Sequence, residues 1–267
     1  MADSPRARRR MVIKLKTPEQ LELMRAAGRV VHRVLECCRQ LCRPGITTRQ
    51  IDEEALKVIT DAGAQGLFKD YPGPGGPFPG NLCISVNEAV VHGIPDDREI
   101  QVGDVVGIDC GVKLNGWCGD SATTILVGKV DARTQQLCEA TRHVLNLAID
   151  NIRPGRKWSQ IARLMQNYAE SKRYGVVRDF VGHGIGQEMH ERPKLPNFVS
   201  RDLLKNDIVL REGMVLAVEP MCNLGTSEVR MLADGWTVVT FDGEPSAHYE
   251  HTIAITENGA DPLTDGR

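Results

Sequence analysis

One segment constrains the fold more than any other part of this chain: residues 104–127, DVVGIDCGVKLNGWCGDSATTILV. It places Asn115-Gly116 between two runs of β-prone residues, which is the strongest short-range signal of a β-hairpin. With a two-residue turn, Leu114 pairs with Trp117, and that pair sets the register of both strands. The segment therefore predicts an antiparallel hairpin whose facing residues can be assigned one by one.

This register brings two aspartates onto one face of the hairpin. Asp109 pairs with Ala122, and Asp120 pairs with Gly111. Because side chains alternate with period two, the aspartates become diagonal neighbours, roughly 7–8 Å apart or less at their bases. Two like charges this close are costly without a cation. The alternative, a pair of solvent-facing acids, would leave the small residues of that face with nothing to cover, so we expect a shared metal ion.

Two further acids and one histidine occupy positions that suit the same site. Glu219 ends a predicted strand at 214–219, and Glu250 lies in a predicted strand at 249–256. An acid in an apolar strand is costly unless it is paired or metal-bound. Either strand alone is compatible with a salt-bridged core acid, but four acids on four strands favour one site. His183 follows a predicted short strand and stands between glycines, which let the backbone bend and expose the ring.

Four carboxylates and one imidazole are the composition of a dinuclear metal site. Carboxylates bridge two hard divalent ions, and an imidazole completes the coordination of one of them. Two such ions a few ångströms apart are suited to activating a water for hydrolysis. Oxygen-rich ligands favour Mn²⁺, Fe²⁺ or Co²⁺ as much as Zn²⁺. We expect two divalent ions (Co, Mn, Fe or Zn) to be held by Asp109, Asp120, His183, Glu219 and Glu250.

The remaining histidines carry weaker signals. His92 precedes a glycine in VHGIP, and His190 ends QEMH, but a lone motif of this kind is also compatible with a buried, hydrogen-bonded histidine. Four others are interpreted as ordinary structural residues: His32, His143, His248 and His251.

The order of predicted elements indicates an α+β protein with two similar halves around one sheet. A capping box at Thr17 and Gln20, with Pro18 in the first turn, begins a helix that ends before Pro44-Gly45. Further helices are predicted from 47 or 48 to 63, over 134–152 and over 159–173. Strands are predicted over 82–86, 214–219, 236–241 and 249–256, whereas PGPGGPFPG at 72–80 is predicted to be a loop.

Composition limits the cellular compartment and the binding partners that can be expected for this chain. The 267 residues carry a net charge of −2, which indicates neither a DNA nor a membrane partner, and no apolar run approaches the roughly 20 residues of a membrane span. Eight cysteines without a C-x-x-C pair favour reduced, buried thiols. We therefore expect a cytoplasmic protein. We interpret residues 1–12 as a basic, disordered tail whose arginines offer a contact to ribosomal RNA, and residues 13–267 as one catalytic domain.

With these residues assembled, the chain resembles the type I methionine aminopeptidases in their short bacterial form. The resemblance runs from about Lys16 to near the C-terminus and is carried by five stretches: NEAVVHGIP (87–95), GDVVGIDCGVKLNGWCGDSATT (103–124), VGHGIGQEMHERP (181–193), GMVLAVEPM (213–221) and DGWTVVT…SAHYEHTIAIT (234–256). It implies the pita-bread fold: two α+β halves related by a pseudo-twofold, with a central antiparallel sheet backed by helices and metals between the halves.

The resemblance also implies residue roles in removing an N-terminal methionine that precedes a small residue. Asp109 would chelate one metal, Asp120 and Glu250 would bridge both, and His183 and Glu219 would ligate the second. Three residues would be catalytic: His92 near the scissile amide, His190 at the carbonyl oxygen and Glu219 as proton shuttle. The methionine pocket would be lined by Phe78, Cys83, Met189 and Trp236, beside His92 and His190. Asn87 and Ser246 match residues that bind a monovalent cation (Na or K) in some relatives.

The chain departs from the family pattern in the pocket. Met189 stands where many relatives have an aromatic residue, and the loop at 72–80 replaces a segment that usually carries a tyrosine. Tyr71 is a candidate substitute for that tyrosine.

Related classes are disfavoured by spacing. Prolidases carry a large extra N-terminal domain, type II enzymes insert a subdomain between the last two glutamates, and non-catalytic relatives lose ligands. The expected partners are the N-terminal methionine peptides of nascent chains and transiently the ribosome, and the family suggests a monomer.

Overall fold

The computed structural model describes residues 13–267, so the predicted basic tail at 1–12 lies outside the described residues. Among those residues, no helix combines the length and the apolar character needed to cross a membrane. The helices are α1 (Pro18–Leu41), α2 (Thr48–Asp61), α3 (Ala132–Asn151), α4 (Trp158–Ser171) and the short α5 (Arg201–Lys205).

Helices α1 and α2 begin where their capping residues predict. Thr17 accepts a hydrogen bond from Gln20 N, and the Gln20 side chain accepts from Thr17 N, which is the predicted capping box. Thr47 and Gln50 form an equivalent capping box at the start of α2, which was not among the predictions. These caps satisfy backbone N–H groups that a helix end leaves without partners, so the first two helices are set by local sequence.

The predicted hairpin is confirmed with its register. Strands β4 (Val105–Leu114) and β5 (Trp117–Leu126) are antiparallel, and Asp109 lies opposite Ala122 while Asp120 lies opposite Gly111. The turn residues Asn115 and Gly116 both have positive φ, at 50° and 81°, as the preferred two-residue hairpin turn requires. Strands β1 (Gln65–Gly66) and β2 (Cys83–Val86) extend this sheet on the open edge of β4.

The second half contains the largest sheet. Its strand order is β15 (Gly259–Pro262), β14 (His251–Thr256), β9 (Val215–Val218), β7 (Gly182–Gly184) and β8 (Glu191–Leu195). Two three-stranded sheets complete the structure: β13 (Ser246–His248), β10 (Met221–Asn223) and β6 (Gly175–Val176); and β11 (Val229–Met231), β12 (Val238–Thr240) and β3 (Ala89–Val91). Every strand pairing described in residues 13–267 is antiparallel, as the α+β prediction requires.

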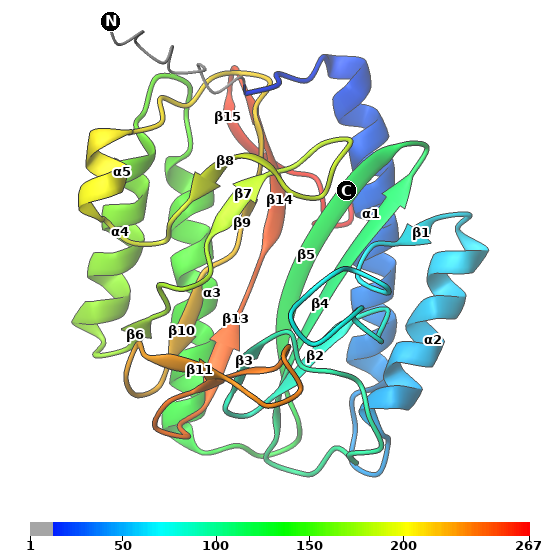
Figure 1. Cartoon of the computed structure of the whole chain (residues 1–267). Coiled ribbons are helices and arrows are strands. Elements are labelled where there is room, and N and C mark those ends of the chain that lie inside the picture. Colours follow the sequence, from blue (N-terminus) through cyan, green and yellow to red (C-terminus); the bar gives the residue numbers. More distant parts are fainter. Residues whose placement is uncertain (1–12) are drawn as a thin grey trace, which may run out of the picture.

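Each half has a large apolar cluster between its helices and its strands, and Figure 1 shows how these helices and strands are arranged. The first packs α1 and α2 against the outer face of the hairpin, where Val106, Ile108 and Cys110 are fully buried. The second packs α3 and α4 against the sheet of β9 and β14, around the fully buried Trp158. The helices therefore cover the outside, and the strands of both halves face each other in between.

Four predicted positions differ from the structure by a residue or two. Glu219, predicted as the last residue of a strand, follows β9, and Glu250, predicted within a strand, precedes β14. His183 lies within β7, not after a strand. Trp236 precedes β12. At Glu219 and Glu250 the chain is therefore outside the hydrogen-bonded ladder where it meets the site.

Candidate metal centre

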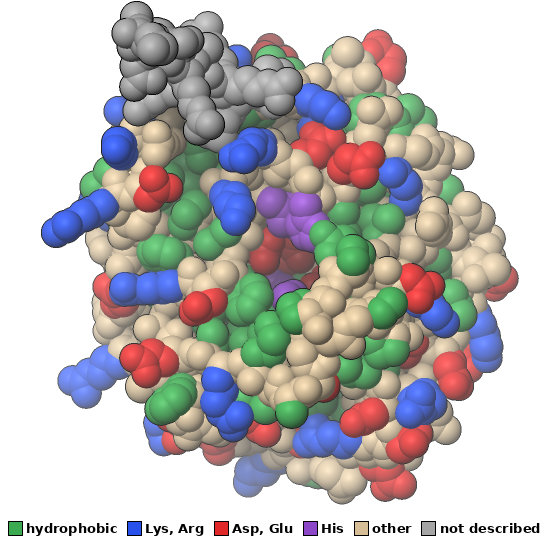
Figure 2. Space-filling view, in the orientation of Figure 1, with side chains coloured by type: hydrophobic (Ala, Val, Ile, Leu, Met, Phe, Trp, Pro, Cys, Tyr) green, Lys and Arg blue, Asp and Glu red, His purple; other side chains and the backbone are tan. Residues whose placement is uncertain are grey.

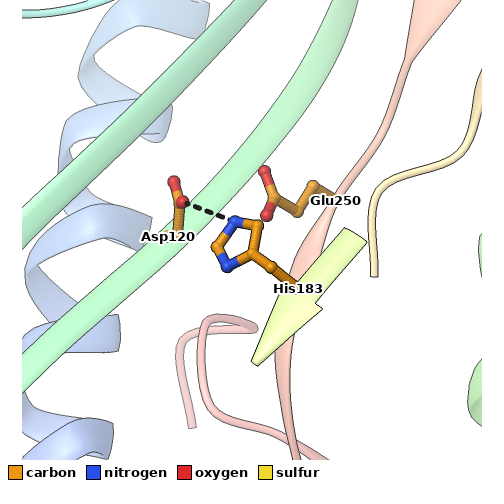
Figure 3. Close-up of side chains that lie close together, drawn as sticks. All are labelled: Asp120, His183 and Glu250. Carbon is orange, nitrogen blue, oxygen red and sulfur yellow. Dashed lines mark ion pairs between the residues drawn. The ribbon is translucent and has the colours of Figure 1, made fainter. Parts of the chain in front are cut away.

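The structure brings all five predicted ligands to one point between the halves. Asp109 and Asp120 come from the hairpin, and the other three come from three strands of the second half: His183 on β7, Glu219 after β9 and Glu250 before β14. All five line one cavity. Figure 3 shows the side chains of Asp120, His183 and Glu250 pointing toward one another from these separate strands.

Short distances connect the cluster. Ligand atoms of Asp120, His183 and Glu250 all lie within 4.8 Å of one another, a spacing that allows them to share an ion. His183 Nε2 is 3.8 Å from Asp120 Oδ2 and 3.5 Å from Glu219 Oε1. The Asp109 and Asp120 carboxyl groups are close enough for each to shift the pKa of the other.

The ring of His183 presents a lone pair to these acids. Its Nδ1 lies 2.9 Å from the carbonyl oxygen of Gly184. A carbonyl oxygen accepts hydrogen bonds, so Nδ1 carries the proton and Nε2 has the free lone pair. Burial also lowers the pKa of His183 to about 4, which keeps the ring neutral. A neutral nitrogen with its outer N–H bonded to a backbone carbonyl is the usual form of a metal-ligating histidine.

The carboxylates of the cluster are buried, and some of their oxygen atoms have no hydrogen-bond partner. Asp120 and Glu250 are 3% exposed. Burial raises the pKa of Asp120 to about 7 and, together with the charge of Asp120, that of Glu219 to about 8. Burial and neighbouring acids raise the pKa values of Asp109 and Glu250 well above their usual range. Three buried oxygen atoms in this cluster have no hydrogen-bond partner: Asp109 Oδ1, Asp120 Oδ1 and Glu250 Oε1.

These unsatisfied oxygens test whether the site fits metal ions. Buried acceptors without donors are rare and costly, and uncompensated buried charge more so. Divalent cations would satisfy the free carboxylate oxygens and the His183 lone pair together, and they would favour the ionised acids. The residues present therefore fit a metal centre of oxygen and nitrogen ligands.

Backbone pairing between the halves holds the ligands in register. Asp120 N donates to Thr252 Oγ1, and that hydroxyl donates to the Asp120 carbonyl. Glu250 N donates to the Ala122 carbonyl, and Ser121 Oγ donates to the Glu250 carbonyl at 2.5 Å. Strand β5 is thereby joined to the start of β14 on either side of the acids, so the hairpin cannot shift without breaking these bonds.

The ligands form the floor of a cavity of about 550 Å³. Figure 2 shows acidic side chains at the bottom of a hollow, with histidines at its edge and hydrophobic side chains beside it. The predicted pocket residues Phe78, Cys83, Met189 and Trp236 all line this cavity. The Phe78 and Trp236 rings meet edge to face at 5.1 Å, and Phe78 is 1% exposed. This wall is apolar and deep enough for a long unbranched side chain.

His92 and His190 both line this cavity. His92 has a left-handed backbone, at φ 59°, and its ring stands edge-on to Phe180 at 5.2 Å. Burial lowers the pKa of His92 to about 4. The His190 ring is 4.4 Å from that of His183, and loss of solvent lowers its pKa too. Both rings are therefore neutral near pH 7 and able to donate or accept one hydrogen bond at each nitrogen.

Two aromatic residues of the cavity were not predicted from sequence, Phe68 and Phe180. Single aromatics in loops carry no periodic signal, so no sequence pattern pointed to them. Tyr71, the candidate substitute for the tyrosine of the family pocket, does line the cavity. The adjacent His248 is buried, its Nε2 has no hydrogen-bond partner, and burial and His92 lower its pKa to about 3.

The predicted monovalent-cation residues lie next to each other, outside the cavity lining. Ser246 N donates to the Asn87 carbonyl at 2.9 Å. The Asn87 side chain donates to Asp104 and accepts from Val105 N, and Ser246 Oγ is 2.9 Å from Asn223 Oδ1. The neighbourhood is oxygen-rich, but cation binding there stays a prediction.

Comparison with known proteins gives one consistent result. The model of "Metallopeptidase family M24" matches residues 22–257. Methionine aminopeptidase 1 of Bacillus subtilis is 45% identical over 249 residues, which are 93% of this chain and 98% of that protein. The methionine aminopeptidase of Escherichia coli K12 is 40% identical over 256 residues, 95% of this chain and 94% of that protein.

Solved structures agree with the sequence relatives. The crystal structure of methionine aminopeptidase from Thermotoga maritima has a TM-score of 0.89 and 41% identity, covering 95% of this chain and 99% of that one. Prolidase from Pyrococcus furiosus has a TM-score of 0.76 at 23% identity and covers 95% of this chain but 66% of its own. The second likeness concerns the fold alone. The predicted pita-bread fold is confirmed by these neighbours.

Proposed function

The chain belongs to the methionine aminopeptidases of metallopeptidase family M24, and we propose that it removes the N-terminal methionine of nascent proteins whose second residue is small. One observation carries this proposal. Buried acids with unsatisfied oxygen atoms form the floor of a cavity whose wall is apolar and aromatic. The floor suits metal-dependent hydrolysis, and the wall suits a methionine side chain.

The metal ligands in this proposal are Asp109, Asp120, His183, Glu219 and Glu250. Two divalent ions (Co, Mn, Fe or Zn) would supply Lewis-acid polarisation of the substrate carbonyl and lower the pKa of a bound water toward 7. The protein itself holds four acids and one imidazole at this spacing, with ligand atoms that are not already engaged in hydrogen bonds. The three unsatisfied oxygens and the Nε2 lone pair of His183 support that role.

Three side chains are proposed to move or hold protons. Glu219, which lines the cavity beside His183, carries the proton from the attacking water to the leaving amine, acting first as general base and then as general acid. Neutral His190 donates a hydrogen bond to the carbonyl oxygen as negative charge develops there. His92 contacts the nitrogen of the scissile amide. The C–N bond breaks as water adds to the carbonyl carbon, which releases methionine and the shortened chain.

The methionine side chain is proposed to lie against Phe78, Cys83, Met189 and Trp236. An unbranched thioether makes favourable contacts with aromatic ring edges. The charged substrate amine would stay near the acidic floor. This arrangement selects the first residue by shape and the chain terminus by charge.

Further parts of the proposal concern location and partners. We infer a cytoplasmic enzyme, because all eight cysteines are free thiols and seven of them are buried. We also infer a monomer that meets nascent chains transiently at the ribosome. Asn87 and Ser246 are proposed to help bind Na⁺ or K⁺.

The test pairs a ligand with a structural acid of similar chemistry. Asp109→Asn and Glu219→Gln should abolish turnover of the peptide Met-Ala-Ser and lower bound metal after purification, while circular dichroism stays unchanged. Asp207→Asn is the matched control, because Asp207 accepts from Ser159 N and Ser159 Oγ away from the cavity. Retained turnover in Asp109→Asn with metal supplied would contradict the proposal.

Substrate choice separates this function from that of fold neighbours. The enzyme should cleave Met-Ala-Ser far faster than Met-Leu-Ser, and it should leave Xaa-Pro peptides intact. Cleavage of Xaa-Pro at a comparable rate would favour a prolidase-type activity instead.

A further inference from the structure

Tyr71 makes a contact in the cavity that none of the proposed catalytic roles uses. Its hydroxyl oxygen lies 2.9 Å from Nδ1 of His190. The two rings also meet edge to face, with centroids 5.6 Å apart and planes at 77°. The residues are far apart in sequence, so the contact depends on how the loop that carries Tyr71 is held.

That loop is braced against the apolar wall. Phe78 N donates to the Tyr71 carbonyl, and Tyr71 N donates to the Phe68 carbonyl. The indole N–H of Trp236 donates to the Gly76 carbonyl at 3.1 Å. Gly73 lies so close to Trp236 that an added Cβ would be 2.3 Å from the indole ring. Tyr71 is therefore presented to His190 from a loop fixed at both ends and in the middle.

The backbone beside His190 is anchored independently. Glu191 Oε2 lies 2.8 Å from Lys16 Nζ, and the two side chains are 8% and 4% exposed. Glu191 opens β8 and pairs with Gly184 of β7. These bonds fix the backbone position of His190, but they do not determine which nitrogen of its ring carries the proton.

The hydrogen bond with Tyr71 can determine which nitrogen of His190 is protonated. An imidazole nitrogen is a strong acceptor, while a phenol is a good donor and a weak acceptor. The favoured bond therefore runs from Tyr71 O–H to an unprotonated Nδ1. The neutral His190 ring then carries its proton on Nε2. A donor N–H at the second nitrogen is what stabilisation of a carbonyl oxygen requires.

We propose that Tyr71 is a positioning residue that holds His190 in the Nε2–H tautomer and keeps its ring oriented toward the substrate carbonyl. This rests on the oxyanion role given to His190 in the proposed function. Tyr71 acts through His190 and has no chemical step of its own. Without the hydroxyl, the ring rotates between orientations and spends part of its time with Nε2 as an acceptor.

The kinetic test removes the hydroxyl and keeps the ring contact. Tyr71→Phe should lower kcat for Met-Ala-Ser about 3- to 10-fold, the size expected for one hydrogen bond that faces solvent, with KM within about twofold. Tyr168→Phe is the matched control, because Tyr168 packs on His143 at 4.5 Å outside the cavity. An unchanged kcat in Tyr71→Phe, or a loss seen in KM alone, overturns the proposal; the latter would make Tyr71 a substrate contact.

A spectroscopic test reads the tautomer directly and does not depend on turnover. In Zn²⁺-loaded protein with ¹⁵N-labelled histidines, His190 should show an unprotonated Nδ1 and a protonated Nε2, with its signals assigned by their loss in His190→Gln. In Tyr71→Phe these shifts should move toward a tautomer mixture, while those of His143 stay in place. A His190 that keeps the same shifts in both proteins overturns the proposal, even if the peptide activity fails for another reason.

Discussion

The floor and the wall of the cavity are built in two different ways. The floor, with Asp109, Asp120 and His183, lies on paired strands whose neighbours are set by hydrogen-bonded ladders. The wall, with Tyr71, Met189 and Trp236, lies on loops that are held by contacts with one another. Ladder geometry follows from local register, whereas loop geometry depends on the assembled molecule. The arrangement of the floor residues relative to one another can therefore be predicted from sequence, whereas the contacts that arrange the wall cannot.

The two parts also differ in what they cost the fold. The floor buries acids whose pKa values are raised, which is unfavourable for the ionised forms. The wall buries apolar rings, with Phe78 almost fully enclosed, which is favourable. Metal ions should thus stabilise the floor strongly and affect the wall little. A change made in one part can therefore be tested for its effect on the other.

Outside the metal ligands, the largest effect is expected in the wall, at His190. His190→Ala should lower kcat about 100-fold, or about 2.7 kcal/mol, because loss of an oxyanion donor has an effect of this order. Metal content should not change, since the floor is intact. Steady-state kinetics with Met-Ala-Ser measure it, and His143→Ala on α3 is the control. A kcat equal to that of the unsubstituted enzyme would remove the oxyanion role.

The next effect tests the floor through pH. In metal-free protein the raised pKa values mean that the folded state binds protons the unfolded chain releases, so stability falls as pH rises from about 4 through the folded values, about 7 for Asp120 and about 8 for Glu219. Each proton held contributes about 1.4 kcal/mol per pH unit. The metal-free form should thus lose about 2 kcal/mol or more between pH 6.5 and 8.

The buried histidines act in the opposite direction. The depressed pKa values of His92 and His183, about 4, and of His248, about 3, make stability fall as pH drops through about 6.5, so they offset part of the loss in metal-free protein. His92 and His248 are not metal ligands in the proposal, so the comparison with metal-loaded protein cancels their contribution. Chemical denaturation of metal-free and metal-loaded protein at pH 6.5 and 8 measures the effect. If the stability of both forms depends on pH in the same way, metal binding does not remove the cost of ionising the buried acids.

A smaller effect should appear in the wall when the loop is moved. Gly73→Ala places a Cβ against the Trp236 ring, so the loop or the indole has to shift. We expect KM for Met-Ala-Ser to rise about 10-fold, close to 1.4 kcal/mol, with kcat less affected. Gly66→Ala on β1 is the control, because its nearest neighbour is 3.9 Å away. Comparable KM values in both variants would argue against a braced wall.

The smallest effect concerns the turn that joins β4 and β5. Gly116 has φ 81°, so Gly116→Ala should lower the free energy of unfolding by about 1 kcal/mol. Activity of the folded fraction should not change, since cross-strand pairing holds both aspartates. Urea unfolding measures the loss, and Gly116→Asn, which tolerates this conformation, should recover part of it. A fall in kcat would mean that the turn controls ligand positions after all.

Local patterns predicted the parts of the molecule that depend on near neighbours. The Asn115-Gly116 turn gave the register of Asp109 and Asp120 residue by residue, and Thr17 and Gln20 marked the start of α1. The positions of Glu219 and Glu250 were shifted slightly, because both leave their strands at the inner surface. Tyr71 was a candidate for the pocket, but its contact with His190 was not predicted, because His190 lies on a loop from the other half.

The sequence by itself determined the family, the two-half α+β plan and the four acids and one imidazole of the floor. These rest on short-range periodicity, turn chemistry and motifs, which act within a few residues. The tertiary structure alone decided which loops meet over that floor, that His183 turns Nε2 toward the acids, and that Tyr71 bonds His190. Those features come from contacts between segments distant in the chain, and such contacts exist only once both halves have packed together.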